Sequence, residues 1–247
     1  EKPYPFRAEN EWPLARTQWT KHYLRIEKQE QGHEEMAVEG TLATEAPKAV
    51  GKLSYSASGM TKAGVASGSS LSTTHGGAAR LGVSFETAPM AADTEITGPI
   101  AMHLWVSSTT EDMDIFVTLR NIGPDGKEVH EVGQHGQPVP LTKGWLRAAH
   151  RKTDPKKSLP YRPYHPHNER WWLNPGEPVE CPIEIWPTCI VLKKGHKLRV
   201  DIQPRDGVGS APYTHYHADY NAGATNTIYS GGDKPSYLLL PVIPARK

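Results

Sequence analysis

The chain has 247 residues, of which 37% are hydrophobic, and it carries a formal net charge of +1. The length and apolar content are sufficient for one large folded domain, while the near-zero charge gives no general attraction to nucleic acid or to a membrane surface. No stretch of about 18 apolar residues is present, which excludes a hydrophobic membrane-spanning helix. The 22 glycines and 22 prolines are spread between short apolar runs, and this distribution indicates many turns.

The first 18 residues are rich in proline and aromatic side chains, and we expect residues 1–18 to form an extended arm that leads from a missing upstream domain. Residues 19–247 are expected to form one domain, with a first strand over 19–26. The segment 28–50 is polar and mixed. The segment 51–79 is so rich in Gly, Ser, Thr and Ala that it indicates a long loop, and such loops are usually functional or mobile.

Apolar side chains alternate regularly with polar ones after residue 80. This period of two is typical of strands that place one face on a core and the other in water. The strand candidates in this part of the chain lie at 80–86, 100–108, 114–121 and 144–152. A proline-rich crossover follows over 153–178.

The segment from Val179 to Gln203 is predicted to form two strands around a turn at Lys194-Gly195-His196. We expect its charged side chains to face solvent or a partner domain. These residues are Glu180, Glu184, Lys197, Arg199 and Asp201. A polar loop over 204–235 and a last strand over 236–244 complete an all-β fold of about eight strands with long loops, without a convincing amphipathic helix.

The two cysteines, Cys181 and Cys189, are eight residues apart on a segment that is predicted to be extended. At about 3.3 Å per residue they would be separated by roughly 26 Å. Because a disulfide requires Cα atoms within about 7 Å, we expect two free thiols. Free thiols and the lack of a recognisable signal peptide favour a cytoplasmic location.

No serine has the surroundings of an α/β-hydrolase nucleophile. That nucleophile lies in a Gly-x-Ser-x-Gly turn between a strand and a helix, and no serine of this chain has glycine at both flanking positions. We therefore assign no catalytic residue to the chain.

Two histidine pairs raise the possibility of metal binding. His215-Tyr216-His217 is similar to the first metal motif of cupins, because alternate histidines on a strand place both imidazoles on one face. However, Asn221 stands where that motif has Glu, and no later histidine could complete the second cupin motif. The pair His165 and His167 has no third ligand close in sequence. We expect no metal and no cofactor, and a cupin-like metalloprotein is kept as an alternative.

Aromatic residues gather in the second half of the chain. They are Tyr161, Tyr164, Trp171, Trp172, Tyr213, Tyr216 and Tyr220. One interpretation is an aromatic platform for sugars, which would make the chain a carbohydrate-binding jelly-roll module. The other is a surface buried between domains, where rings with one apolar and one polar end are favoured.

A series of short motifs in a fixed order carries a family resemblance. The first half has Glu11-Trp12-Pro13, Tyr23-Leu24, Thr97-Gly98-Pro99, Leu104-Trp105-Val106-Ser107-Ser108, Asp112-Met113-Asp114-Ile115 and Pro124-Asp125-Gly126. The second half has Pro175-Gly176-Glu177, Gly195-His196-Lys197-Leu198-Arg199, Asn226-Thr227-Ile228-Tyr229 and the run from Pro235 to Pro244. Over essentially its whole length, the chain resembles the C-terminal domain of cocaine-esterase-like and X-Pro dipeptidyl-peptidase-like (CocE/NonD) serine hydrolases.

The resemblance implies a jelly-roll β-sandwich of the galactose-binding-like kind that follows an α/β-hydrolase domain. In such enzymes the Ser-His-Asp triad lies in the hydrolase domain, so this segment alone would be no enzyme, whereas its parent would be an esterase or a dipeptidyl-peptidase. The segment would pack on that catalytic domain and help to shape its pocket for a small-molecule ester or peptide. The choice among ester, amide and X-Pro peptide stays open, as does the oligomeric state.

The same resemblance implies that the loops 51–79 and 204–224 face the hydrolase domain. The candidate residues for the domain interface or the substrate pocket are Tyr213, His215, His217, Asn221 and Trp172. No nucleic-acid or membrane partner is expected.

Overall fold

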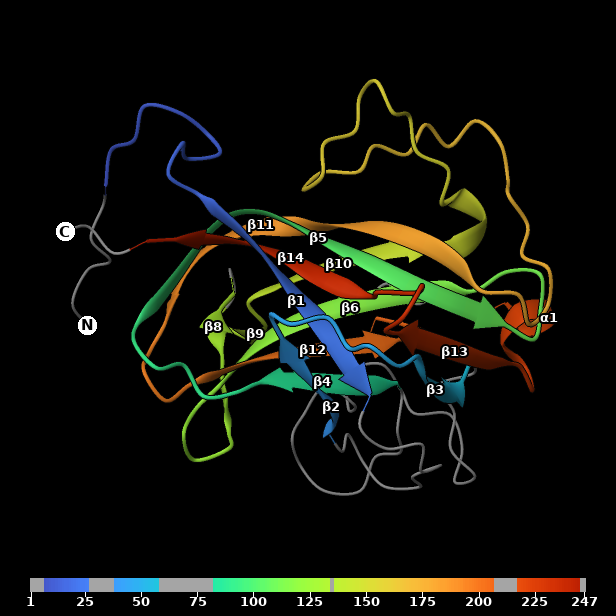
Figure 1. Ribbon diagram of the computed structural model, residues 1–247, viewed down its shortest axis with the longest axis horizontal. Coiled ribbons are helices and arrows are strands. Elements are labelled where there is room, and N and C mark those ends of the chain that lie inside the picture. The colour runs from blue at the N-terminus through green and yellow to red at the C-terminus, as the bar shows by residue number, and fades with distance from the viewer. Residues whose placement is uncertain (1–6, 27–37, 58–81, 134–135, 207–216, 245–247) are drawn as a thin grey trace.

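The computed structural model describes residues 7–26, 38–57, 82–133, 136–206 and 217–244 (Figure 1). Its strands are β1 (Gln18–Ile26), β2 (Val38–Ala43), β3 (Gly51–Ser56), β4 (Val83–Thr87), β5 (Thr94–Ser108), β6 (Asp114–Ile122), β7 (Glu128–Val129), β8 (Glu131–Val132), β9 (Pro138–Val139), β10 (Thr142–Arg147), β11 (Val179–Leu192), β12 (Lys197–Gln203), β13 (Thr225–Ser230) and β14 (Tyr237–Ile243). The helical elements are a 3-10 turn, η1 (Ala148–His150), and one short helix, α1 (Ala218–Asn221). The described part of the chain is therefore almost entirely β-structure.

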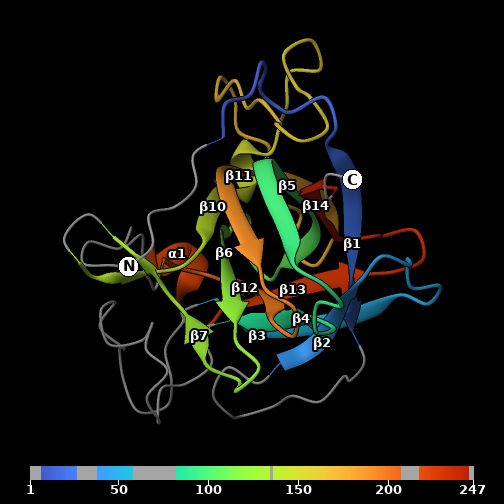
Figure 2. The ribbon, with the colours of Figure 1, turned by 90° about the vertical axis from the view of Figure 1, so that its left-hand side faces the viewer.

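Most of the strands belong to one sheet that closes on itself. The pairing runs in the order β11-β10-β6-β12-β4-β2-β1-β14-β5, and β5 pairs in turn with β11. The β2–β4 pair is parallel, and the other pairs in this ring are antiparallel. Figure 2 shows these strands curving around a common interior. The 15-residue strand β5 also pairs with β13, which carries β3 on its far edge.

The alternation of side chains in β6 explains how the closed sheet forms a core. Ile115, Val117 and Leu119 point into the apolar interior, where they are at most 1% exposed. The intervening residues Phe116 and Arg120 lie on the outer face of the sheet, yet they are also buried. Each fully buried Leu or Ile side chain contributes about 1.5–3 kcal/mol relative to exposure, so the interior supplies the main stabilising term.

A buried ion-pair network covers part of that outer face. Arg120 Nε donates to Asp201 Oδ2 at 2.5 Å, and Arg120 Nη1 donates to both carboxylate oxygens of Glu128 at 2.9 and 2.8 Å. Ser84 Oγ donates to the second oxygen of Asp201 at 2.7 Å. The expectation that Asp201 faces solvent or a partner domain is therefore wrong, because its carboxylate is fully buried among donors from β4 and β6.

The structure confirms the strand pair around Gly195, which adopts a positive φ of 85° in the turn between β11 and β12. It also contains more strands than the eight or so that were expected. β2 lies in the mixed segment 28–50, β3 in the first part of the expected loop 51–79, and β13 in the expected polar loop 204–235. These strands were missed because they are short and rich in Gly, Ser, Thr and Asn, which give little apolar alternation.

The proline-rich crossover lacks regular strands, as expected, apart from an isolated bridge between Leu159 and Arg162. It projects above the sheet in Figure 1. The free state of Cys181 and Cys189 is confirmed. Within the described ranges, neither helical element has the length and apolar character needed to cross a membrane.

Candidate functional site

A buried asparagine organises the corner of the molecule at which α1 lies. Asn221 Oδ1 accepts a hydrogen bond from the backbone N–H of His217 at 2.7 Å, and Asn221 Nδ2 donates to the carbonyl oxygen of Ala57 at 3.0 Å. Asn221 is only 3% exposed, so these bonds satisfy polar groups that water does not reach. Its amide closes the helical turn and joins it to the end of β3, which leaves it occupied and unsuited to the role of a metal ligand.

Aromatic rings cover the outer side of this corner. The ring of His217 stacks on Tyr220 with centroids 4.6 Å apart, and Trp172 from the crossover lies 6.2 Å from the same Tyr220 ring. The guanidinium of Arg147 lies 6.0 Å from that ring on another side. Tyr220 thus connects α1, the crossover and the end of β10, and the sequence reasoning did not assign it to the site.

Three of the five predicted site residues, His217, Asn221 and Trp172, therefore come together at one corner. Tyr213 and His215 lie outside the described residues. Trp171 and Trp172 have different neighbours: Trp171 lies 5.6 Å from the guanidinium of Arg151, whereas Trp172 lies against Tyr220. Trp172 is 44% exposed, so it offers an indole surface to a partner or ligand.

A buried carboxylate holds Arg147 beside this corner. Asp112 Oδ1 accepts hydrogen bonds from the backbone N–H groups of Met113 and Ala149, both at 2.9 Å, and thereby fixes the 3-10 turn η1 to the start of β6. Burial raises the pKa of the Asp112 carboxyl. Arg147 Nε lies 3.4 Å from Asp112 and donates to Asp114 at 3.0 Å. The sequence shows the Asp112-Met113-Asp114 motif. Its pairing with Arg147 could not be predicted, because it follows from the register in which β10 pairs with β6.

Histidines fasten the crossover to the sheet. His165 lies between two backbone carbonyl oxygens, with Nδ1 3.0 Å from that of Lys152 and Nε2 3.0 Å from that of Pro182. His150 Nδ1 and His167 Nδ1 are 3.0 Å apart. Burial lowers the pKa of His165 and of His150. Among the residues that the structure describes, no group of three or more His, Cys, Asp or Glu side chains is arranged to hold a metal.

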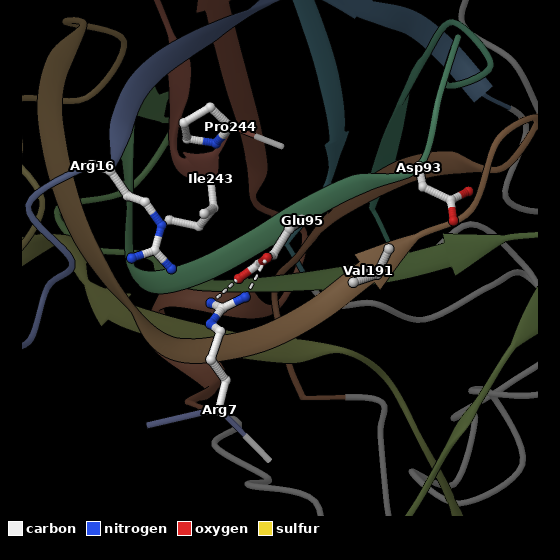
Figure 3. Close-up of a pocket in the computed structure, with 7 residues that line it drawn as sticks. All are labelled: Arg7, Arg16, Asp93, Glu95, Val191, Ile243 and Pro244. Carbon is white, nitrogen blue, oxygen red and sulfur yellow. Dashed lines mark hydrogen bonds and ion pairs between the residues drawn. The ribbon is translucent and has the colours of Figure 1, made fainter. Parts of the chain in front are cut away.

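A second polar site lies where the N-terminal residues meet β5. Arg7 donates to both carboxylate oxygens of Glu95, at 3.0 and 2.6 Å (Figure 3). Glu9 pairs with Arg7 and Arg16. The hydrogen bond from Arg7 lowers the pKa of Glu95, and that from Arg16 lowers the pKa of Glu9 to about 2. Arg7, Arg16 and Glu95 line a cavity of 220 Å³, and the Arg7–Glu95 pair joins the N-terminal residues to β5.

The larger cavity, of 640 Å³, lies on the outer face of β6, β10 and β11. Its lining includes Trp145, Trp186, Arg147 and Glu184. It also includes His150 and His167, whose ring nitrogens contact each other. Sequence reasoning did not identify this groove, because its residues come from separate strands and only the register places them side by side.

Comparison with known proteins gives one family match along nearly the whole chain. Residues 2–239 match the family described as the X-Pro dipeptidyl-peptidase C-terminal non-catalytic domain. A protein of Mycobacterium bovis named as a serine esterase is 26% identical over 166 residues, which are 65% of this chain and 24% of the relative. The cocaine esterase of a Rhodococcus species is 25% identical over 172 residues, which are 64% of this chain and 25% of the relative.

Solved structures share the fold over most of the chain. A CocE/NonD family hydrolase from Staphylococcus aureus has a TM-score of 0.76 and 24% identity, over 97% of this chain and 39% of that one. An aminopeptidase from a marine sediment archaeon, Thaumarchaeota archaeon, has a TM-score of 0.61 and 13% identity, over 95% of this chain and 38% of that one. The chain thus spans about a quarter of the curated relatives and under half of these structures.

Proposed function

Because the chain belongs to the family of X-Pro dipeptidyl-peptidase C-terminal non-catalytic domains, we propose that it packs on an α/β-hydrolase domain of a larger serine hydrolase and helps to shape that enzyme's substrate pocket. The relatives named as esterases support an ester- or amide-cleaving parent. The short span of the chain relative to these proteins supports the assignment of the chemistry to a part that lies outside it.

The observation that carries the interface proposal is the convergence at the α1 corner. Ala57 immediately precedes residues 58–81, and His217 immediately follows residues 207–216. Asn221 is hydrogen-bonded to both Ala57 and His217, so the start of the first segment and the end of the second lie close together. Trp172 and Tyr220 provide partly exposed rings beside them. Aromatic side chains at the centre of an interface carry much of its binding energy, which supports a domain contact at this corner.

We also propose the type of β-fold and the division of the chain into an arm and a domain. The closed, mainly antiparallel sheet, with few helical residues and a TM-score of 0.76 to a CocE/NonD hydrolase, supports a jelly-roll β-sandwich. We place the domain at 19–247 and the connecting arm at 1–18. The buried side chain of Leu14 and the Arg7–Glu95 pair support an arm that packs on the domain rather than a free linker.

Binding to the separately expressed catalytic domain of the parent enzyme tests the interface. We expect Trp172→Ala to weaken this binding by about tenfold or more, as loss of an aromatic anchor does. In the intact parent, the same change should raise KM for its ester or amide substrate. Trp186→Ala is the matched control, because Trp186 is similarly exposed, at 54%, but lies away from the corner.

Two outcomes would contradict the proposal. One is equal binding by Trp172→Ala and the unaltered chain. The other is hydrolysis of a p-nitrophenyl ester by the 247-residue chain alone that is lost when one of its own serines is changed to Ala.

A further inference from the structure

The 640 Å³ groove on the outer face of the sheet has the size and chemistry of a small-molecule site. Ligand pockets usually measure about 300–1,000 Å³ and combine apolar rings with a few polar groups. The groove is lined by residues of β6, β10, β11 and the crossover, among them Asp114, Trp145, Arg147, Glu184 and Trp186. It shares Arg147 with the α1 corner but is not lined by Trp172, Tyr220 or Asn221, so its function goes beyond the domain packing proposed above.

The register of β10 and β11 brings a carboxylate and two indoles together. Gly144 pairs with Ile185 in the antiparallel ladder, so the next residue, Trp145, stands opposite Glu184. The rings of Trp145 and Trp186 lie 5.3 Å apart at 63° to each other. Glu184 and Trp186 are two residues apart on β11 and share a face.

Glycine at position 144 permits this close approach. A Cβ atom on Gly144 would lie 2.3 Å from the carbonyl oxygen of Glu184, which is closer than real Cβ atoms come to any neighbour. The strands can therefore approach here only without a side chain. Thr142 Oγ1 also donates to the carbonyl oxygen of Trp186 at 2.7 Å and fixes the backbone there.

Trp186 lies on the outer face of β11, next to an irregularity in that strand. The β11–β5 register shifts between Ile185 and Thr188, and such bulges redirect side chains. Trp186 is 54% exposed, whereas Ile185 beside it is fully buried. The chain thus holds a large apolar ring at the surface of a groove, on a rigid strand.

The charges in the groove leave one carboxylate uncompensated. Arg147 is paired with Asp114 by two hydrogen bonds, at 3.0 and 3.2 Å. Among the described residues that line the groove, Glu184 is the charged group that has no ion pair. Glu184 lines the groove together with the indoles of Trp145 and Trp186, and a carboxylate and an indole ring each attract a cation.

We propose that this groove binds a small organic ammonium compound, whose positive charge lies between the Glu184 carboxylate and the indoles of Trp145 and Trp186. A cation over an indole face is attracted by the ring, and the Glu184 carboxylate adds charge attraction. A strongly hydrated metal ion would gain little from the rings, whereas an alkylated ammonium places apolar surface on them.

Titration with choline and with its uncharged isostere 3,3-dimethyl-1-butanol tests the proposal. The two probes have nearly the same shape and differ in charge. We expect saturable 1:1 binding of choline by the 247-residue chain, measured by calorimetry and by tryptophan fluorescence at one fixed ionic strength. The neutral alcohol should bind at least about tenfold more weakly, because it lacks the charge that the indoles and carboxylate attract.

Variants identify the residues responsible. Glu184→Gln and Trp186→Ala should each weaken choline binding by about tenfold, since each removes one of the two attractions. Both side chains are exposed, so the variants should keep the fold, and an unchanged thermal transition verifies this. Trp172→Ala and Glu111→Gln are matched controls at exposed positions outside the groove and should bind choline normally.

Three results would overturn the proposal: no saturable binding of choline, equal affinity for choline and its neutral isostere, or normal binding by folded Glu184→Gln. The interface at the α1 corner is tested by Trp172→Ala. The two proposals therefore fail separately.

Discussion

Asn221 and Ala57 are 164 positions apart in the chain, and a 3.0 Å hydrogen bond joins the side-chain amide of one to the backbone carbonyl of the other. This bond connects α1 to the end of β3. The oxygen of the same amide holds the backbone of His217, so a single buried side chain sets the position of the aromatic rings at this corner.

Replacement of Asn221 by Ala should destabilise the domain. It would leave the buried carbonyl of Ala57 and the N–H of His217 unpaired, and an unsatisfied buried group costs about 1–3 kcal/mol. We expect the free energy of unfolding in urea to fall by about 2 kcal/mol. Asp219→Ala, on the same helix but exposed, should change it by less than about 0.5 kcal/mol. Similar values for the two variants would contradict this role for Asn221.

Loss of Arg120 should be more damaging. The change Arg120→Met removes the buried cation between Asp201 and Glu128. Asp201 then keeps Ser84 and Arg199, and Glu128 keeps His130, but neither carboxylate keeps the close guanidinium that joins the two. Breaking a buried pair in this way typically costs about 3–5 kcal/mol, which urea denaturation would report.

The control for Arg120→Met is Lys193→Met. Lys193 pairs with Asp93 at a similar distance, 2.8 Å, but both side chains are more than half exposed. Exposed pairs contribute about 0.2–1 kcal/mol. If both variants lost the same stability, burial of the Arg120 network would not be the reason for its importance.

Stability should fall as the pH is lowered from about 7.5 to 5.5. Burial depresses the pKa of His165 in the folded state below the unfolded value of about 6.5, so folding favours the neutral imidazole. The contribution is present above the unfolded pKa and is lost as the pH falls through the folded pKa.

The pH effect is checked by urea denaturation of the unaltered chain and of His165→Asn at several pH values. The variant cannot take up the proton, so its stability should fall less over this interval, although it is less stable at pH 7.5. His22 and His150, whose pKa values burial also lowers, keep part of the slope in both proteins. Parallel curves would assign the acid sensitivity to groups other than His165.

Strands with an apolar alternation could be predicted from the sequence, and those without it could not. β11 and β12 present apolar residues at every second position, and both were identified. β13 has Asn226 and Ser230 at its buried positions, so its pattern resembles a polar loop. Asp201 was misplaced for a similar reason, because its burial depends on Arg120 from β6, and a single strand does not reveal its partner across the sheet.

The candidate site could be predicted only as a set of residue types. The family resemblance pointed to the loops, and three of its candidate interface or pocket residues, Trp172, His217 and Asn221, lie at one corner. Tyr220, the ring beside Trp172 and His217, was named only in the aromatic set and not among the interface or pocket candidates, because α1 has only four residues and gives no helical periodicity. The Trp145–Glu184–Trp186 arrangement depends on the Gly144–Ile185 register pair between β10 and β11, which leaves no signal in sequence spacing.

The two cysteines should differ sharply in reactivity. Cys181 is completely buried, and burial raises the pKa of its thiol to about 12, so almost none of the reactive thiolate is present at pH 8. Cys189 is exposed on the same strand. Iodoacetamide at pH 8 should therefore modify one thiol per native chain, at Cys189, and both thiols in urea, as counted by mass spectrometry. The variant Cys189→Ser should take up no label when native and one label when unfolded. Labelling of Cys181 in the native variant on the timescale of Cys189 would mean that β11 opens readily at its pairing with β5, which is inconsistent with a long strand whose inward side chains are fully buried.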